Sequence, residues 1–267
     1  MILDGYTLRS VHPYAEPISL AQAKRQLRVD GTDDDTYITA LIGAARDYVE
    51  NSTNCQLVLA SFEQQLDEFP CHRLFCLDYP PLRKVTSIAY TDANGTAQTL
   101  STSIYAVDTG MLPGQVSLTY GHVWPPTRCV PNAVTVSFQA GYAIPFTAAT
   151  NDTITFYGYQ PTNGERYRLS ATDGVLPGGL SFTQDYYVIN ASGYTCNFST
   201  TSGGSAVDIT SVGTTGTFFA GVIPPAAIHA MLLLISWMYD NRSANIDANK
   251  IPPQINWALS SIKWGAY

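Results

Sequence analysis

The sequence predicts an α+β fold: a helical bundle of three to four helices with an antiparallel β-sheet, plus an inserted all-β module of the sandwich or barrel type. Three observations predict it. Two prolines lead into a long apolar run at Pro224 to Arg242, which is typical of a buried helix. Between residues 55 and 142, apolar and polar positions alternate between turn signals, as in antiparallel strands. Residues 144–220 hold only seven charged residues and no lysine, in short alternating segments separated by Gly, Asn and Pro.

The N-terminal part predicts two helices. Ser19 stands before the first, with Gln22 three residues on; this capping-box pattern predicts a short helix from Leu20 to about Val29. From Tyr37 to Asn51, apolar residues recur at the spacing of an amphipathic helix, whose apolar face can cover one side of the helix at 224–242. Three aspartates at 33–35 precede it, and we expect one of them to cap it. A cation site is the alternative, but the spacing is not that of an EF-hand.

The middle of the chain predicts an antiparallel sheet. Asn94-Gly95 marks a hairpin turn between two strands, and pairs of prolines mark loops or edges. The predicted strands are Leu57–Phe69, Val85–Thr91, Ala97–Leu100, Ser103–Val107, Gln115–Tyr120 and Ala133–Ala140.

Residues 144–220 look inserted into a parent domain. The strand that ends near Tyr142 and the helix that begins at Pro224 would join across a short loop, and loops whose two ends lie close tolerate insertions. The sequence therefore predicts one domain made of residues 1–143 and 221–267, with helices and an antiparallel sheet. A second, small β-domain is predicted at residues 144–220.

The helix predicted at 224–242 is the centre of this arrangement. Its apolar side chains spread round most of the circumference, so more than one neighbour must cover it, from the same chain or from a second copy. The apolar run is shorter than the roughly 20 residues of a bilayer span, so no membrane partner is expected. The side chains predicted to lie in the core or between subunits are Ile228, Met231, Leu232, Ile235, Trp237 and Tyr239.

The C-terminus predicts a last short helix with an aromatic end. Pro252 and Pro253 open it, Ile255, Leu259 and Ile262 share one face, and no acidic side chain follows residue 247. Such a segment either docks on its own domain or is reserved for a partner, and both alternatives stay open.

Composition favours a structural or binding role over catalysis. The net charge of −7 argues against a protein whose main task is to bind nucleic-acid phosphates. The five cysteines are an odd number without a CxxC pair, so we expect reduced thiols rather than a zinc site or a complete disulfide framework. The four histidines lack metal-ligand spacing, and no nucleophile elbow, Walker A loop or dinucleotide-binding motif occurs. We therefore expect no enzyme, no catalytic residue, no metal and no cofactor, and His229 as a core or interface residue.

Five segments follow one another in a specific order. They are EPISLAQAKRQLRVDGTDDDTYITALIGAARDYVENSTN, YPPLRKVTSIAYTDANGTAQTL, AVTVSFQAGY, IPPAAIHAMLLLISWMYDNR and IPPQINWALSSIK. In these segments the chain resembles the head–tail connector (adaptor) proteins of tailed bacteriophages, in particular the gp6-like and phiE125 gp8-like group. The inserted β-module departs from that family, whose members usually have only a few residues there.

The resemblance implies a structural virion protein without catalysis. It implies a homo-oligomeric ring, commonly of twelve copies, under the portal vertex, joining the portal protein to a tail or stopper/nozzle protein. Genomic DNA would pass through the ring without sequence-specific binding, and an acidic balance suits such a channel. The implied location is the head–tail junction of the virion, after assembly in the host cytoplasm. In such connectors the C-terminal segment often engages the portal, so the expected portal-docking residues are Lys250, Ile255, Trp257, Leu259, Ile262, Lys263, Trp264 and Tyr267.

The inserted module leaves a second function open, that of a carbohydrate- or envelope-binding β-module of the virion. Exposed aromatic rings with few charges nearby can stack on sugars, but in most β-modules such rings form the core instead. The aromatic residues concerned are Tyr157, Tyr159, Tyr167, Tyr186, Tyr187 and Phe198.

Overall fold

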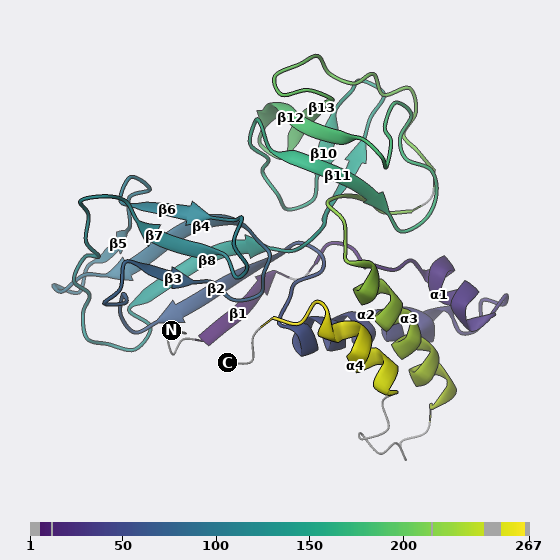
Figure 1. Cartoon of the computed structure of the whole chain (residues 1–267), viewed down its shortest axis with the longest axis horizontal. Helices are drawn as coiled ribbons and strands as arrows, with labels where there is room; N and C mark the ends of the chain where they lie inside the picture. The colour runs from purple at the N-terminus through teal and green to yellow at the C-terminus, as the bar shows by residue number, and fades with distance from the viewer. Residues whose placement is uncertain (1–5, 12, 215, 243–251, 265–267) are drawn as a thin grey trace. The chain divides into compact units, whose positions relative to one another are not determined.

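The computed structural model describes residues 6–11, 13–214, 216–242 and 252–264, and the chain divides into two compact units (Figure 1). The sheet unit comprises Met1–Pro13, Asn54–Gly141 and Trp264–Tyr267. The helix–barrel unit comprises Tyr14–Thr53 and Tyr142–Lys263. These boundaries group the inserted segment with the helices, whereas the sequence groups the helices with the sheet. The domain boundaries at 143/144 and 220/221 stay a prediction.

The sheet unit contains two antiparallel sheets, so the predicted antiparallel sheet is confirmed but divided. The larger has the strand order β1-β2-β8-β4-β5 and the smaller the order β3-β7-β6. The strands of the larger sheet are β1 Tyr6–Val11, β2 Ala60–Leu66, β8 Val134–Ala140, β4 Leu82–Thr91 and β5 Ala97–Thr99. Those of the smaller sheet are β3 Leu74–Cys76, β7 Gln115–Leu118 and β6 Tyr105–Asp108.

The core of the sheet unit follows from the period-two pattern of its strands. Along β2 and β8, buried residues alternate with half-buried ones because one face packs on the core. Phe62 and Phe138 are cross-strand partners whose ring centroids lie 5.4 Å apart, and Tyr79 stacks on Phe62 at 4.8 Å. The predicted hairpin turn also forms: the Asp92 carboxylate accepts hydrogen bonds from two backbone N–H groups of the turn, and Gly95 adopts φ +85°.

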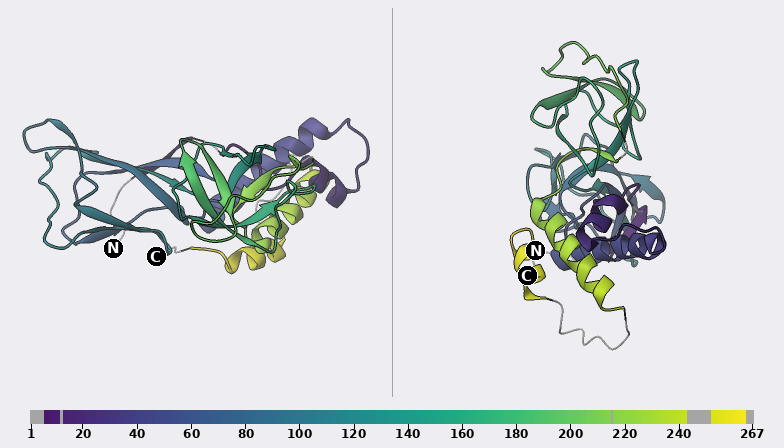
Figure 2. Two further views of the ribbon diagram at one scale, coloured as in Figure 1. Left: turned by 90° about the horizontal axis from the view of Figure 1, so that it is seen from above. Right: turned by 90° about the vertical axis from the view of Figure 1, so that its right-hand side faces the viewer.

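The helix–barrel unit holds four described helices, α1 Leu20–Leu27, α2 Asp35–Thr53, α3 Pro225–Asp240 and α4 Pro253–Ser260. The predicted capping box is confirmed, because Ser19 Oγ accepts from the N–H of Gln22 at 3.0 Å and the Gln22 side chain accepts from the N–H of Ser19 at 3.2 Å. Helix α3 packs against α2 and α4 and touches α1 (Figure 2). In the described part of the chain, no helix has the length and apolarity needed to cross a membrane.

A buried ion cluster anchors α2 to the segment before α1. Arg46 is 7% exposed; its Nε lies 2.8 Å from Glu16, and its Nη1 lies 2.9 Å from Asp47 and 3.3 Å from the fully buried Glu50. Burial by itself would lower the pKa of Arg46, but the neighbouring carboxylates, Glu16 first, raise that pKa above its usual value. The guanidinium therefore stays charged, and it neutralises a carboxylate that has no access to water.

The inserted segment forms a closed antiparallel barrel with the strand order β10-β13-β12-β11-β14-β9. The sequence left a sandwich and a barrel open; the barrel forms because β9 pairs with β10 and closes the sheet. Its interior is aromatic, with Phe146, Phe156, Tyr186 and Phe198 almost fully buried. The strands are β9 Ile144–Ala148, β10 Ile154–Phe156, β11 Arg166–Ala171, β12 Asp185–Ser192, β13 Thr195–Ser199 and β14 Phe218–Ala220.

All five cysteines are free thiols. Cys55 and Cys196 are buried, and Cys71 and Cys129 are exposed. Burial in the barrel, together with the nearby Glu165 carboxylate, raises the pKa of Cys196 to about 12, so this thiol stays protonated and packs as an apolar side chain.

Phe198→Ala should destabilise the barrel by about 3–5 kcal/mol, because the ring contacts Phe146, Phe156 and Tyr186 and its loss leaves a cavity. Urea unfolding followed by near-ultraviolet circular dichroism measures the loss. The control is Tyr194→Ala on the same barrel, since that ring is 51% exposed and should cost less than about 1 kcal/mol. Equal losses in the two variants would contradict the assignment of Phe198 to the core.

Candidate assembly surfaces

Helix α3 is covered on one side within the described chain. Its fully buried residues Ala227, Ala230, Met231, Leu234 and Ile235 share a face that packs on the other helices. The opposite side is mostly apolar but incompletely covered. Ser236 in its middle accepts a hydrogen bond from Gln26 of α1 at 3.3 Å. Ile228, Leu232, Leu233 and Trp237 are half-buried, and His229 is exposed. We call these last five residues the outer face of α3. Apolar groups left half in water on a regular helix provide a surface that a partner can bury.

The structure divides the side chains predicted for the core or the subunit interface into two groups. Met231 and Ile235 are fully buried and belong to the core of one chain. Ile228, Leu232, Trp237 and Tyr239 reach the surface. The sequence did not single out Leu233, which lies one helical turn after His229 and one turn before Trp237. That i, i+4 spacing was the signal that could have found it.

A polar cluster fixes the C-terminal end of α3. Asp34 accepts hydrogen bonds from the Tyr239 hydroxyl at 2.5 Å and from Arg242 Nη2 at 2.9 Å. The Arg242 guanidinium lies over the rings of Tyr239 and Tyr37, 4.2 and 4.8 Å from their centroids. The hydrogen bonds from Arg242 and then Tyr239 hold the pKa of Asp34 below its usual value. This carboxylate therefore joins α2 to α3.

The next carboxylate of the acidic triplet has a similar role. Asp35 lies 2.6 Å from Lys24 and so joins α2 to α1, while its place in the first turn of α2 also suits the helix dipole. In the described residues, no group of three His, Cys, Asp or Glu side chains is arranged to hold a metal ion. The structure gives the triplet helix-joining contacts that the sequence did not predict: Lys24 lies 11 residues from Asp35, and the partners of Asp34 lie 205 and 208 residues away.

Helix α4 places the predicted portal-docking residues on two different sides. Ile255 and Leu259 are buried with Ala258 within the helix–barrel unit, so they serve the chain's own core. Trp257 is 80% exposed, and Lys263 is exposed. Ile262 and Trp264 are half-buried, and Lys250 and Tyr267 lie outside the described residues. Of the predicted portal-docking residues that the structure describes, Trp257 and Lys263 are therefore the two that are exposed to solvent.

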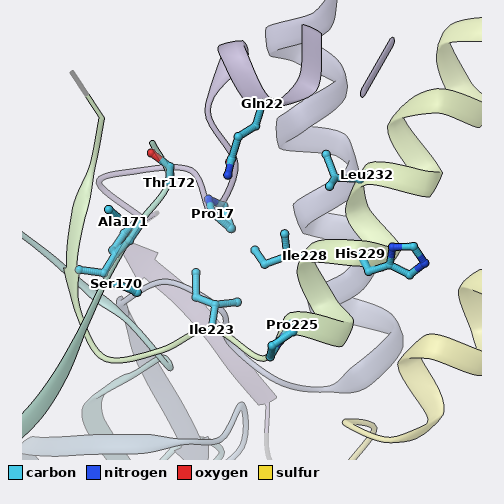
Figure 3. Close-up of a pocket in the computed structure, with 11 residues that line it drawn as sticks. Pro17, Gln22, Ser170, Ala171, Thr172, Ile223, Pro225, Ile228, His229 and Leu232 are labelled. Atoms are coloured by element: carbon cyan, nitrogen blue, oxygen red, sulfur yellow. The ribbon is translucent and has the colours of Figure 1, made fainter. Parts of the chain in front are cut away.

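A shallow hollow of about 340 Å³ lies beside the N-terminal half of α3 (Figure 3). It is mostly apolar, and Pro17, Ile223 and Ile228 approach one another from three segments of the chain. Its other lining residues come from α1, from the ends of β11 and β14, and from α3; they include Gln22, Ala171, Thr172, Phe219, Leu232 and His229. The hollow shows that side chains fill the space between the barrel strands and the helices incompletely.

The aromatic residues of the barrel lie mainly in its interior. Tyr159, Tyr167, Tyr186 and Phe198 are 1–4% exposed, and Tyr187 is half-buried. Tyr157 alone of the six is exposed, at 44%. Four rings that the sugar-stacking alternative needs on the surface thus form the barrel core, because a closed barrel fills its interior with large side chains.

The comparisons with known proteins agree with the resemblance stated from the sequence. Residues 17–73 match the family described as phage gp6-like head-tail connector protein. This confirms the resemblance for the part of the chain that forms α1, α2, β2 and the connection toward β3. No curated protein matches the chain.

Solved structures share the fold over nearly the whole chain. A chain from the neck of an empty GTA particle, computed with C6 symmetry, has a TM-score of 0.56 at 13% identity and covers 98% of this chain and 97% of that one. A chain from the virion of a native gene transfer agent (GTA) particle has a TM-score of 0.53 at 15% identity, with coverages of 98% and 96%. A chain from the neck of a native GTA particle, computed with C12 symmetry, has a TM-score of 0.52 at 14% identity, with coverages of 99% and 97%. The fold is thus shared with neck components, and together with the family match it supports a structural connector role.

Asp34→Asn should loosen the end of α3 in a pH-dependent way. The pKa of Asp34 is lower in the folded chain than its usual value of 3.8, so its contribution to stability is present above that value and is lost as the pH falls below it. The wild type should therefore have the higher melting temperature at pH 6, and the difference should shrink progressively as the pH falls below 3.8. Thermal unfolding at several pH values measures this. A difference that is independent of pH would contradict the role of the charge.

Proposed function

We propose that this protein is a head–tail connector whose copies form a ring under the portal vertex of a tailed particle and join the portal to the next tail or stopper component. The observation that carries the proposal is the outer face of α3, which stays apolar and incompletely covered in a single chain. The match of residues 17–73 to gp6-like connectors supports it, as does the fold shared with GTA neck chains.

The partner proposed for the outer face of α3 is a second copy of the chain. A repeated contact between two different surfaces of identical subunits closes into a ring when the rotation between neighbours divides the circle. The likeness to neck chains computed with C6 and C12 symmetry favours such a closed arrangement, and twelve copies is the number we propose. The outer face itself carries no acidic or permanently cationic side chain, so burying it between copies leaves no unpaired full charge.

In this proposal, the net negative charge of the chain allows DNA to pass through the ring, and no DNA-binding site is needed. The net charge of −7 disfavours tight binding of phosphates, so DNA would move through the ring without sequence-specific contacts. In this proposal the chain has no catalytic role, no cofactor and no metal. Its place is the head–tail junction of the virion, reached after assembly in the host cytoplasm.

We propose α4 and the residues that follow it as the part that meets the portal. Trp257 is a large ring with 80% of its surface in water, and such rings dominate the energetics of many interfaces when a partner buries them. The exposed Lys263 adds a positive charge one turn beyond the helix. The opposite side of α4 is held by the buried Ile255 and Leu259, which keeps the ring directed away from the chain's own core.

Leu233→Asp should prevent ring formation while leaving the single chain folded. The side chain is half-buried, so one chain tolerates the change, whereas an interface would have to desolvate the new carboxylate. We expect the concentration needed for assembly to rise by about tenfold or more, measured by light scattering or mass photometry. Ala40→Asp, which adds the same charge at an exposed position of α2, is the control and should assemble normally. Normal rings from Leu233→Asp would remove the outer face of α3 from the interface.

Trp257→Ala should weaken binding to the portal protein of the same particle by about 10- to 100-fold without changing the oligomeric state. Gln254→Ala, at an exposed position of the same helix, should bind normally. Truncation after Asn249 removes α4 altogether and should abolish co-assembly with the portal. Undiminished binding by the truncated chain would exclude this segment as the docking element.

A further inference from the structure

The barrel has one short covalent link to the helices. After β14 ends at Ala220, three residues lead to Pro224 and the first turn of α3. The first of them, Gly221, adopts φ +117°, a region that favours glycine. The next, Val222, is 46% exposed. Gly221 is itself held by β11, because its N–H donates to the Arg168 carbonyl at 2.8 Å and its carbonyl accepts from the Ser170 hydroxyl at 2.7 Å, and Ile223 is 7% exposed. The exposed Val222, between these two held residues, is therefore where the link can turn.

Apolar packing between the barrel strands and the helices is incomplete. The hollow of about 340 Å³ described above is bordered by Ala171 and Thr172 at the end of β11 and by Ile228 and Leu232 on α3. The hollow is open to water, so its lining side chains make fewer protein contacts across it than a close-packed junction would provide. Specific polar contacts therefore contribute a larger share to holding the barrel in place.

One such contact uses both oxygens of a single carboxylate. Asp173, two residues beyond β11, accepts a hydrogen bond at Oδ2 from the Ser19 hydroxyl and another at Oδ1 from Arg25 Nη2, at 2.6 Å. Ser19 is the N-cap of α1, and its oxygen also accepts from the N–H of Gln22. The Ser19 hydroxyl thus has two roles: its oxygen accepts the hydrogen bond that caps α1, and its one proton is donated to Asp173 of the barrel segment.

A second contact lies on another side of the barrel. The Tyr14 ring lies against Gly158, so closely that an added Cβ at Gly158 would come within 2.1 Å of a ring carbon. Gly158 also has φ +71°, so both space and backbone conformation require glycine there. Tyr14 and Ser19, which make these two contacts, flank Pro17 in the sequence, and Pro17 lines the hollow.

We infer that Asp173 is a clamp that fixes the barrel on the helices through Ser19 and Arg25, and that the link at Val222 is the hinge about which the barrel turns when the clamp opens. The clamp is accessible, since the Arg25 side chain is 63% exposed and that of Asp173 is 21% exposed. A partner that competes for either group can open it. Burial by itself would raise the pKa of Asp173, but the bonds from Ser19 and Arg25 lower it, so the carboxylate is charged at neutral pH.

Hydrogen exchange of the full chain, measured by mass spectrometry, tests the inference with Asp173→Asn and Ser19→Asp. The second variant keeps an oxygen that caps α1 but faces Asp173 with a second carboxylate, so it separates the two roles of Ser19. We expect exchange in residues 170–176 and 221–224 to become about 2- to 5-fold faster in both variants, the range expected for an exposed ion pair. Exchange at the start of α1 and in strands β12 and β13 should not change.

Ser19→Thr and Asp208→Asn are the matched controls. The threonine keeps the cap and the donor, and Asp208 is an exposed carboxylate of the same barrel. Neither should change exchange in the clamp or hinge segments. If Asp173→Asn and Ser19→Asp leave these segments unchanged, or speed exchange equally in β12 and β13, the inference is overturned. The first result would mean that the contact does not hold the barrel, and the second that its loss unfolds the barrel.

Discussion

The organisation of the helices depends on one constraint, the excess of apolar surface on α3. A helix with apolar residues round most of its circumference must be covered on several sides, and this chain supplies α2, α4 and part of α1. These neighbours bury Met231, Leu234 and Ile235 completely. The outer face, from Ile228 to Trp237, remains half in water. A helix with this feature gains stability when a further apolar surface covers it.

The polar contacts around α3 keep that outer face in place. Asp34 at the start of α2 binds Tyr239 and Arg242 at the other end of α3, and the stacked guanidinium adds a contact with Tyr37. Arg46 fixes α2 on the segment that precedes α1 through Glu16, and it also pairs with the buried Glu50 of α2. These pairs involve charges that are partly or fully removed from water, so their geometry is specific. The helices thus form a defined platform that gives the outer face of α3 one orientation.

The barrel shows how a chain accepts an inserted β-module. Its strands all find partners within the segment, and its aromatic interior needs no side chain from the helices. The two chain connections to it leave from paired strands, since Ile144 lies opposite Ala220. Closely spaced ends of this kind let a small domain be added without disturbing the elements on either side. Four of the six rings considered for sugar stacking form the barrel core instead.

The sequence by itself determined the kinds of element and most of their positions. Local patterns carry that information: the capping box at Ser19, the spacing of α2, the prolines before α3 and the alternation of β8 each act within a few residues. The division into two sheets, and the barrel rather than a sandwich, were decided only by the tertiary structure, because strand pairing joins residues far apart in the chain. The contacts of the candidate assembly surfaces also depend on residues far apart in the chain. Asp34 binds Arg242, and Ile255 and Leu259 of α4 are buried while Trp257 is exposed to water. Whether an apolar residue is buried in its own chain or left for a partner depends on which distant helix packs against it, and no local pattern contains that choice.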